Sequence, residues 1–188
     1  LHGGWSNCGT GLPWVDYRRF VKEWGETMTT GQEFPIWMGI AKKYIGTAEI
    51  PGPRNNPTVL RMLKSTNIGA PYNQTELTPW CSAAVNLIMT EARDIDPRIP
   101  LPTHSAAAVS WATWGTELEY GQYGCIVVMS RPGGHHVGFL YEEGEDENGN
   151  YGVKILGGNQ GDAQSIRWFP WNCIIAFRWP KGYPLEEA

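Results

Sequence analysis

The 188-residue chain changes its pattern near Gly121, and this change constrains the fold more than any other feature of the sequence. Before it, apolar residues recur at helical spacing in segments separated by loops rich in Gly, Pro and Asn. After it come short apolar runs of strand length, each bounded by turn-forming residues. Helices followed by strands predict an α+β fold, in which N-terminal helices pack on a C-terminal antiparallel sheet of about five strands.

The helices can be placed from their spacing and their end signals. The segment after Pro35 carries its apolar residues on one helical face, and Gly46 is positioned to end that helix. Pro57 predicts the first position of a second helix. Residues 82–92 are apolar on nearly all sides, which predicts a central buried helix, and residues 105–114 predict a short one.

The strand candidates share a short apolar run with a turn at each end. They are residues 124–129, 136–142, 151–157, 165–169 and 173–178. The turn at residues 147–150, Glu-Asn-Gly-Asn, predicts a hairpin between the second and third candidates. We divide the chain into one domain, residues 34–188, and an N-terminal extension, residues 1–33, with a short helix predicted over residues 15–24.

Composition excludes several classes of function. The net charge is -4 and no Lys/Arg-rich run occurs, which argues against nucleic acid as the main partner. No apolar stretch reaches the roughly 18 residues of a membrane span, and the start shows no signal-peptide pattern. Ten tryptophans indicate an aromatic groove or partner surface, and we expect residues 1–33 to contact a phage or cell-wall protein.

The cysteine spacings do not fit a metal site. Cys8, Cys81, Cys125 and Cys173 form no Cys-x-x-Cys pair, so no zinc site and no cofactor are predicted. Cys125 and Cys173 lie in apolar runs and are interpreted as small buried hydrophobic residues, while a bridge involving Cys8 is left open. The acidic segment at residues 142–147 lacks the ligand spacing of a calcium loop and is interpreted as a solvated hairpin.

Cys81 is the candidate nucleophile. It stands in Pro-Trp-Cys-Ser-Ala-Ala-Val-Asn, at the start of the predicted central helix, where free backbone N–H groups and the helix dipole favour a thiolate. The backbone N–H of Cys81 is the natural oxyanion-hole donor, and Trp80 is expected to wall the cleft. The alternative interpretation is an inert cysteine of the core.

His136 is the candidate general base, because it begins a predicted strand and a strand holds an imidazole stiffly. Side chains alternate along a strand, so only one of His135 and His136 can face the helix, and His135 is the alternative base. Gly138 is expected to leave open space beside His136 for the substrate or the helix. A solvated turn that carries both imidazoles is the alternative.

Asn159 is the candidate orienting group, since it follows two glycines at the end of the next predicted strand. Its amide oxygen can accept the imidazole N–H and fix the tautomer. Gln160 and Asp162 are alternatives for this role, and ordinary turn chemistry would also explain all three. A thiol on a helix, a histidine on a strand and a polar side chain at a strand end follow the order of a papain-like cysteine hydrolase.

Several motifs together carry a family resemblance. They are Pro-Trp-Cys-Ser-Ala-x-Val-Asn at 79–86, Ser-Trp-x-x-Trp-Gly at 110–115, His-Val-Gly-Phe at 136–139, Leu-Gly-Gly-Asn-Gln-Gly at 156–161 and Arg-Trp-Pro at 178–180. Over residues 36–180 the chain resembles the NlpC- and CHAP-type cysteine peptidases and amidases of bacteria and their phages. Two residues depart from the pattern: Ala84 replaces a bulky aromatic, which would enlarge the core or cleft, and His135 adds a second imidazole.

The resemblance implies a papain-like core that hydrolyses an amide bond of peptidoglycan through a Cys81 thioester. The bond would lie in the stem peptide (endopeptidase) or at its junction with the sugar (N-acetylmuramoyl-L-alanine amidase). The resemblance also implies that His136 is the base and Asn159 the orienting group. It also implies action on the bacterial wall, periplasmic or extracellular, in a setting such as a phage endolysin or virion protein.

Two other functions fit the same residues. One is a wall-binding or virion structural module with this fold and little activity, suggested by the tryptophan content. The other keeps the cysteine chemistry but changes the substrate, to protein deamidation or transglutamination, since a fold does not fix a substrate.

Overall fold

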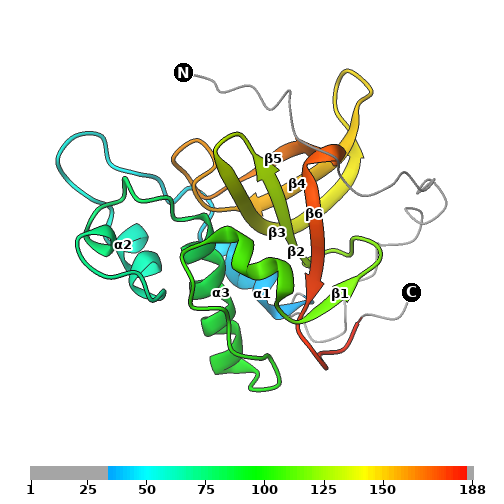
Figure 1. Ribbon diagram of the computed structural model, residues 1–188, viewed down its shortest axis with the longest axis horizontal. Coiled ribbons are helices and arrows are strands. Elements are labelled where there is room, and N and C mark those ends of the chain that lie inside the picture. The colour runs from blue at the N-terminus through cyan, green and yellow to red at the C-terminus, as the bar shows by residue number, and fades with distance from the viewer. Residues whose placement is uncertain (1–33, 186–188) are drawn as a thin grey trace.

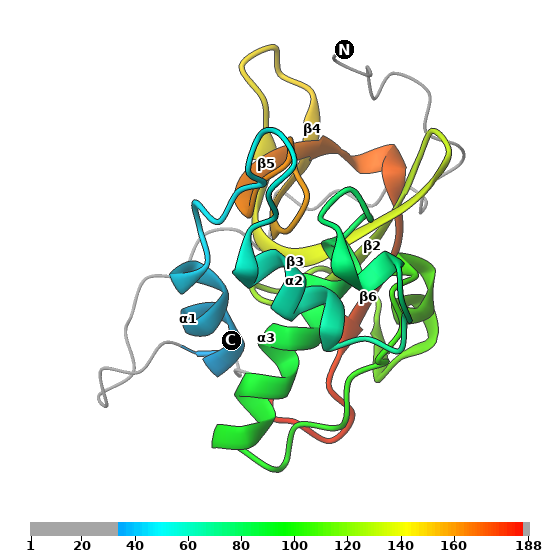
Figure 2. The same ribbon diagram turned by 90° about the vertical axis from the view of Figure 1, so that its left-hand side faces the viewer.

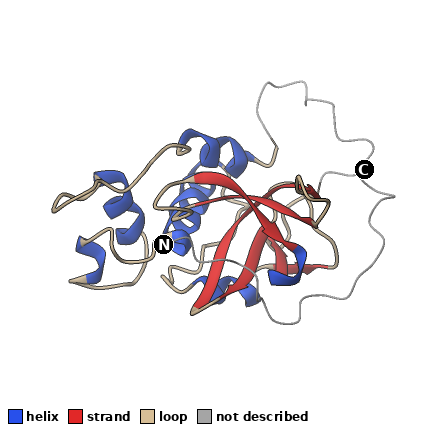
Figure 3. Ribbon diagram, turned by 90° about the horizontal axis from the view of Figure 1, so that it is seen from above, coloured by secondary structure: helices blue, strands red, loops and turns tan. Residues whose placement is uncertain are grey.

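The computed structural model describes residues 34–185. Its helices gather on one side and its strands form a single sheet on the other (Figures 1 and 3). The predicted α+β class is confirmed, with an antiparallel sheet of six strands rather than about five. The extra strand, β1 (Thr116–Leu118), has only three residues and lacks the apolar run by which the other strands could be predicted. The predictions for residues 1–33, including the helix at 15–24, fall outside the described residues.

The three α-helices all precede the sheet in the chain and lie on the same side of it (Figure 2). They are α1 (Ile36–Lys43), α2 (Pro57–Lys64) and α3 (Cys81–Ile95). Pro57 occupies the first position of α2 as predicted, and the Asn56 side chain caps that helix by accepting the Thr58 N–H at 2.9 Å. The short helix predicted at 105–114 is a 3₁₀ helix, Ala108–Thr113.

The sheet has the strand order β1-β6-β2-β3-β4-β5. Its remaining members are β2 (Ile126–Arg131), β3 (Gly134–Glu145), β4 (Tyr151–Gly157), β5 (Ser165–Pro170) and β6 (Ile174–Trp179). The hairpin predicted at residues 147–150 joins β3 to β4. There Asp146 accepts the backbone N–H groups of Asn148 and Asn150, so the acidic segment forms an ordinary hairpin turn.

Gly138 has a different role from the one expected. A Cβ at this position would lie 2.5 Å from Cγ2 of Ile155 and 2.9 Å from the carbonyl oxygen of Leu156. The expectation of open space beside His136 is therefore wrong, because β4 fills it. Gly138 serves the close approach of β3 to β4.

Gly158 brings the end of β4 against the helix that begins with Cys81. A Cβ at Gly158 would lie 2.7 Å from Cβ of Ala84 and 2.7 Å from the Trp80 ring. Ala84 is fully buried and its surroundings are filled by this glycine. The expected enlargement at Ala84 is therefore absent, since Gly158 occupies the space that a bulky side chain at position 84 would need.

Substituting Gly158 by alanine should lower the free energy of unfolding by about 1–3 kcal/mol, because the added methyl must displace either Ala84 or Trp80. Urea unfolding of the purified variant measures this loss. Gly69 is the matched control, since a Cβ there meets nothing within 4 Å, and Gly69→Ala should change stability by less than about 0.5 kcal/mol. Equal stability of the two variants would contradict the packing described.

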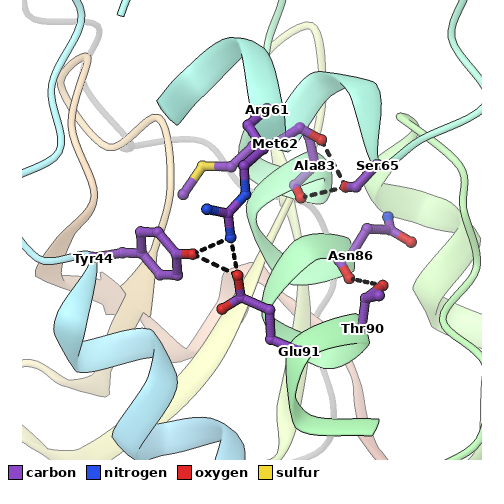
Figure 4. A network of polar contacts seen from close by, with 8 residues as sticks. All are labelled: Tyr44, Arg61, Met62, Ser65, Ala83, Asn86, Thr90 and Glu91. Atoms are coloured by element: carbon purple, nitrogen blue, oxygen red, sulfur yellow. Dashed lines mark hydrogen bonds and ion pairs between the residues drawn. The ribbon is translucent and has the colours of Figure 1, made fainter. Parts of the chain in front are cut away.

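A polar network on the outer side of α3 joins the three helices (Figure 4). The Tyr44 hydroxyl, just after α1, donates to Oε1 of Glu91 on α3 at 2.8 Å. Arg61 on α2 forms an ion pair with Glu91 and donates to the Tyr44 hydroxyl. These groups are partly exposed, so each contact contributes little energy by itself, but together they fix the helix that carries Cys81.

The cysteines divide into two free thiols and one bonded residue among residues 34–185. Cys125 is a fully buried free thiol, as predicted, and Cys81 is the other free thiol. Cys173 is buried, as predicted, but it is disulfide-bonded, so its interpretation as a cysteine that acts only as a small hydrophobic residue is wrong. The question left open for Cys8 concerns a residue outside the described range.

Within residues 34–185, no helix combines the length and the apolar content that crossing a membrane requires.

Candidate active site

Cys81 is the first residue of α3, and its side chain is only 4% exposed. Trp80 immediately before it is fully buried, and its indole N–H donates to Oε1 of Glu49 at 2.9 Å. Trp80 therefore supports the helix start from inside and does not line an open cleft as the sequence suggested.

Two buried polar residues of α3 hold the helix start in place, and neither was singled out from the sequence. The hydroxyl of Ser82 donates to the Ser105 carbonyl at 2.7 Å and accepts the Trp111 indole N–H at 2.9 Å. Asn86 donates to the Ser105 carbonyl and accepts the His104 N–H at 2.7 Å. Because these buried groups are hydrogen-bonded, they anchor the loop at 104–105 over the first turn of α3.

Backbone N–H groups near the sulfur connect the helix to the strand that carries His136. Those of Ser82 and of Val137, the residue that follows His136 on β3, both act to lower the pKa of the Cys81 thiol. The structure thus brings the predicted nucleophile to the segment that bears the predicted base, although 55 residues separate them in the chain.

Burial dominates the acidity of the thiol. Desolvation raises the pKa of Cys81, while the positive charge of Arg131 and the N–H groups of Ser82 and Val137 act in the opposite direction. The expectation of a thiolate in the resting protein is therefore wrong: the helix start favours the anion, but the loss of hydration outweighs it. The sulfur is a neutral thiol that must lose its proton during the reaction.

The two histidines have opposite environments. His136 is 3% exposed, and its ring stands 5.4 Å from the Phe169 ring between centroids. Its Nε2 is 3.0 Å from Oε1 of Gln160. His135 is exposed. Of the two candidates, His136 is the one whose ring is held in a defined position.

Gln160 fixes the tautomer of His136. Its side-chain NH₂ donates to the backbone carbonyls of Ile155 at 3.2 Å and Ser165 at 2.5 Å. These two acceptors determine which end of the amide is nitrogen, so Oε1 must face the imidazole and Nε2 of His136 must carry a hydrogen. Nδ1 is then the bare nitrogen, able to accept a proton.

The side chain that hydrogen-bonds to His136 is thus that of Gln160, one of the two alternatives to Asn159. Asn159 has φ +56°, in the left-handed region that asparagine tolerates, and it turns the chain so that Gln160 enters the interior. Asp162 also lies in this turn, at φ +62°, where its carbonyl accepts the Glu49 N–H at 2.8 Å. Gln160 is only 4% exposed, and the sequence pattern did not indicate that this side chain, among the three candidates, is buried.

His136 is neutral near pH 7. The pKa of His136 is lowered from 6.5 to about 4, because burial and the charge of Arg131 lower it while the hydrogen bond to Gln160 raises it. A neutral imidazole is the form that can accept a proton in general-base catalysis.

The depressed pKa of His136 predicts a loss of stability in acid. Between about pH 6.5 and pH 4 the unfolded chain binds a proton at this residue and the folded chain does not, so the free energy of unfolding falls as the pH falls. The loss is complete near pH 4 and amounts to about 3 kcal/mol. Urea unfolding across this range should show a drop that His136→Gln removes and His135→Gln retains, because His135 is exposed. The same drop in both variants would contradict this assignment.

A cavity of about 390 Å³ is lined by residues 49–55, 75–77 and Asp162. Glu49 connects it to the site through its bond to Trp80. Glu76, 4% exposed, accepts the backbone N–H groups of Ile50 and Asn56 at 2.6 Å and so shapes the loop that forms one wall.

Among the described residues, no three His, Cys, Asp or Glu side chains are grouped as ligands of a metal ion. No family model matches the chain, and no curated protein and no solved structure matches it either.

Proposed function

We propose that this protein is a cysteine hydrolase that cuts an amide bond of bacterial peptidoglycan. One observation supports the chemistry: the buried thiol at the start of α3 is influenced by the backbone N–H of Val137, the residue next to His136, whose ring is hydrogen-bonded to Gln160. Peptidoglycan as the substrate rests on the resemblance to the NlpC and CHAP peptidases and amidases. The place of action would be the bacterial wall, outside the cytoplasmic membrane.

The reaction begins with proton transfer from the Cys81 thiol to Nδ1 of His136. The sulfur then attacks the carbonyl carbon, and the backbone N–H of Cys81, in the first turn of α3, donates to the oxyanion. The C–N bond breaks, and the imidazolium returns its proton to the departing amine. Water then hydrolyses the thioester, which gives a carboxylic acid and restores the thiol.

Gln160 contributes through orientation and through charge. Its Oε1 accepts the Nε2–H throughout the cycle, so it stabilises the imidazolium that forms when Nδ1 takes the proton. Because the pKa of His136 is low in the resting state, the imidazolium is unfavourable and requires the stabilisation that Gln160 provides. Binding of the substrate in a water-free site would strengthen each of these interactions.

The experiment that tests the proposal is digestion of purified sacculi, followed by assay of the chemical groups released. An amide hydrolase produces new amino groups in step with soluble fragments and no new reducing sugar ends. Release of reducing ends would point to cleavage of the glycan, and release of nothing would contradict the proposal.

The burial of Cys81 favours a second candidate, a wall-binding or virion module with this fold and little activity. Such a protein would sediment with sacculi without releasing fragments. Its thiol would also resist iodoacetamide near neutral pH, whereas an active nucleophile would be alkylated.

A further inference from the structure

Arg131 is a charged residue that the mechanism above does not use. It is the last residue of β2 and pairs with Gly134 of β3, two positions after the pair formed by Met129 and His136. Paired residues of antiparallel strands share a face, and so do residues two apart, so Arg131 and His136 lie on the same face of the sheet.

The guanidinium of Arg131 is incompletely satisfied. Its Nε is shielded from solvent and has no hydrogen-bond partner among the described residues, although the residue as a whole is half-buried. A shielded N–H without an acceptor is costly, which indicates that a negative group completes the site during the reaction. Across the hairpin, the place that a side chain of Gly134 would occupy is empty to 4 Å, so a small anion can approach.

The charge of Arg131 acts on both members of the proposed pair. It lowers the pKa of the Cys81 thiol and also that of His136. Within residues 34–185, the first turn of α3 carries no acidic residue that could cancel this effect, and β3 approaches the thiol with the backbone of Val137. The amide of Gln160 is neutral, and His135 is exposed beside the hairpin.

From this placement, and building on the proposed function, we infer that Arg131 stabilises the thiolate of Cys81 and so offsets the desolvation of the buried nucleophile. It acts through the sulfur, as a charge that favours the anion once the proton has moved to His136. The helix start alone does not stabilise the thiolate enough to offset its burial, and the positive charge of the guanidinium adds to that stabilisation.

Alkylation of Cys81 without any wall substrate tests this inference. Iodoacetamide is neutral and iodoacetate is an anion of nearly the same size, so their rates report thiolate formation and local positive charge separately. In Arg131→Gln, the pH midpoint of iodoacetamide alkylation should rise by about one unit, and the ratio of iodoacetate to iodoacetamide rates should fall about tenfold. Arg131→Lys should keep the pH midpoint and the reagent ratio close to those of the unmodified protein, because lysine retains the positive charge.

Three controls make the outcome decisive. Arg98→Gln removes an exposed guanidinium that pairs with Asp96 after the far end of α3, and it should leave both readings unchanged. Cys81→Ala gives the background from Cys125. Added salt should lower the iodoacetate preference of the unmodified protein, which gives a reading even where a variant folds poorly.

An unchanged pH midpoint and an unchanged reagent ratio in folded Arg131→Gln would overturn the inference and leave the proposed function intact. The opposite outcome can also be recognised. A shifted pH midpoint without cleavage of sacculi would support the role of Arg131 and contradict peptidoglycan as the substrate.

Discussion

Cys81→Ala is expected to reduce the rate of fragment release from sacculi by about a thousandfold or more, because it removes the sulfur that forms the proposed thioester. The change removes one sulfur atom from a tightly packed position, so the fold should persist. The rate is followed as loss of turbidity of a sacculus suspension, with circular dichroism to verify folding.

Cys125→Ala is the matched control, since Cys125 is also a buried free thiol but has no part in the proposed chemistry. It should retain activity near that of the unmodified protein. Undiminished lysis by Cys81→Ala would remove the cysteine mechanism.

His136→Ala is expected to lower the rate of fragment release by about 10²–10⁴, the usual contribution of a positioned general base. The loss should appear mainly in kcat, because the imidazole moves the proton and does not bind the wall. Initial rates over a range of sacculus concentrations separate kcat from KM.

The neighbouring imidazole supplies the control for this prediction. His135→Ala should change kcat by less than about twofold, because His135 is exposed and the histidine that is hydrogen-bonded to Gln160 is His136. A large loss in His135→Ala, with normal activity in His136→Ala, would exchange the roles of the two histidines.

The elements of this fold could be predicted because their signals are local. Pro57 and Asn56 mark the start of α2, and the Asn-Gly turn at residues 148–149 marks the β3–β4 hairpin, without help from distant residues. β1 was missed because its three residues are held only by pairing with β6. No local pattern encodes that contact.

The site could be predicted in outline but not in its energetics. The order of Cys81 and His136 in the sequence indicated the pair, and the motif placed a polar residue after β4. Whether that residue is Asn159 or Gln160 depends on the left-handed turn at Asn159, which only the backbone reveals. The raised pKa of Cys81 likewise follows from burial, a property of the whole fold.

The glycines illustrate the same limit. Gly138 lies within β3 and Gly158 directly follows β4, and the sequence does not indicate which segment packs against each of them. In the structure Gly138 accommodates β4 and Gly158 accommodates α3. Each contact joins segments far apart in the chain.

Mass spectrometry of sacculi digested in H₂¹⁸O addresses the chemistry most directly, since hydrolysis of an amide leaves one solvent oxygen in a new carboxyl group and a free amine on the other fragment. We expect muropeptides that carry a single ¹⁸O at one defined carboxyl, formed only when Cys81 is present. Label on a sugar hydroxyl, or on side-chain carboxyls of intact stem peptides, would contradict the account in favour of glycan cleavage or deamidation.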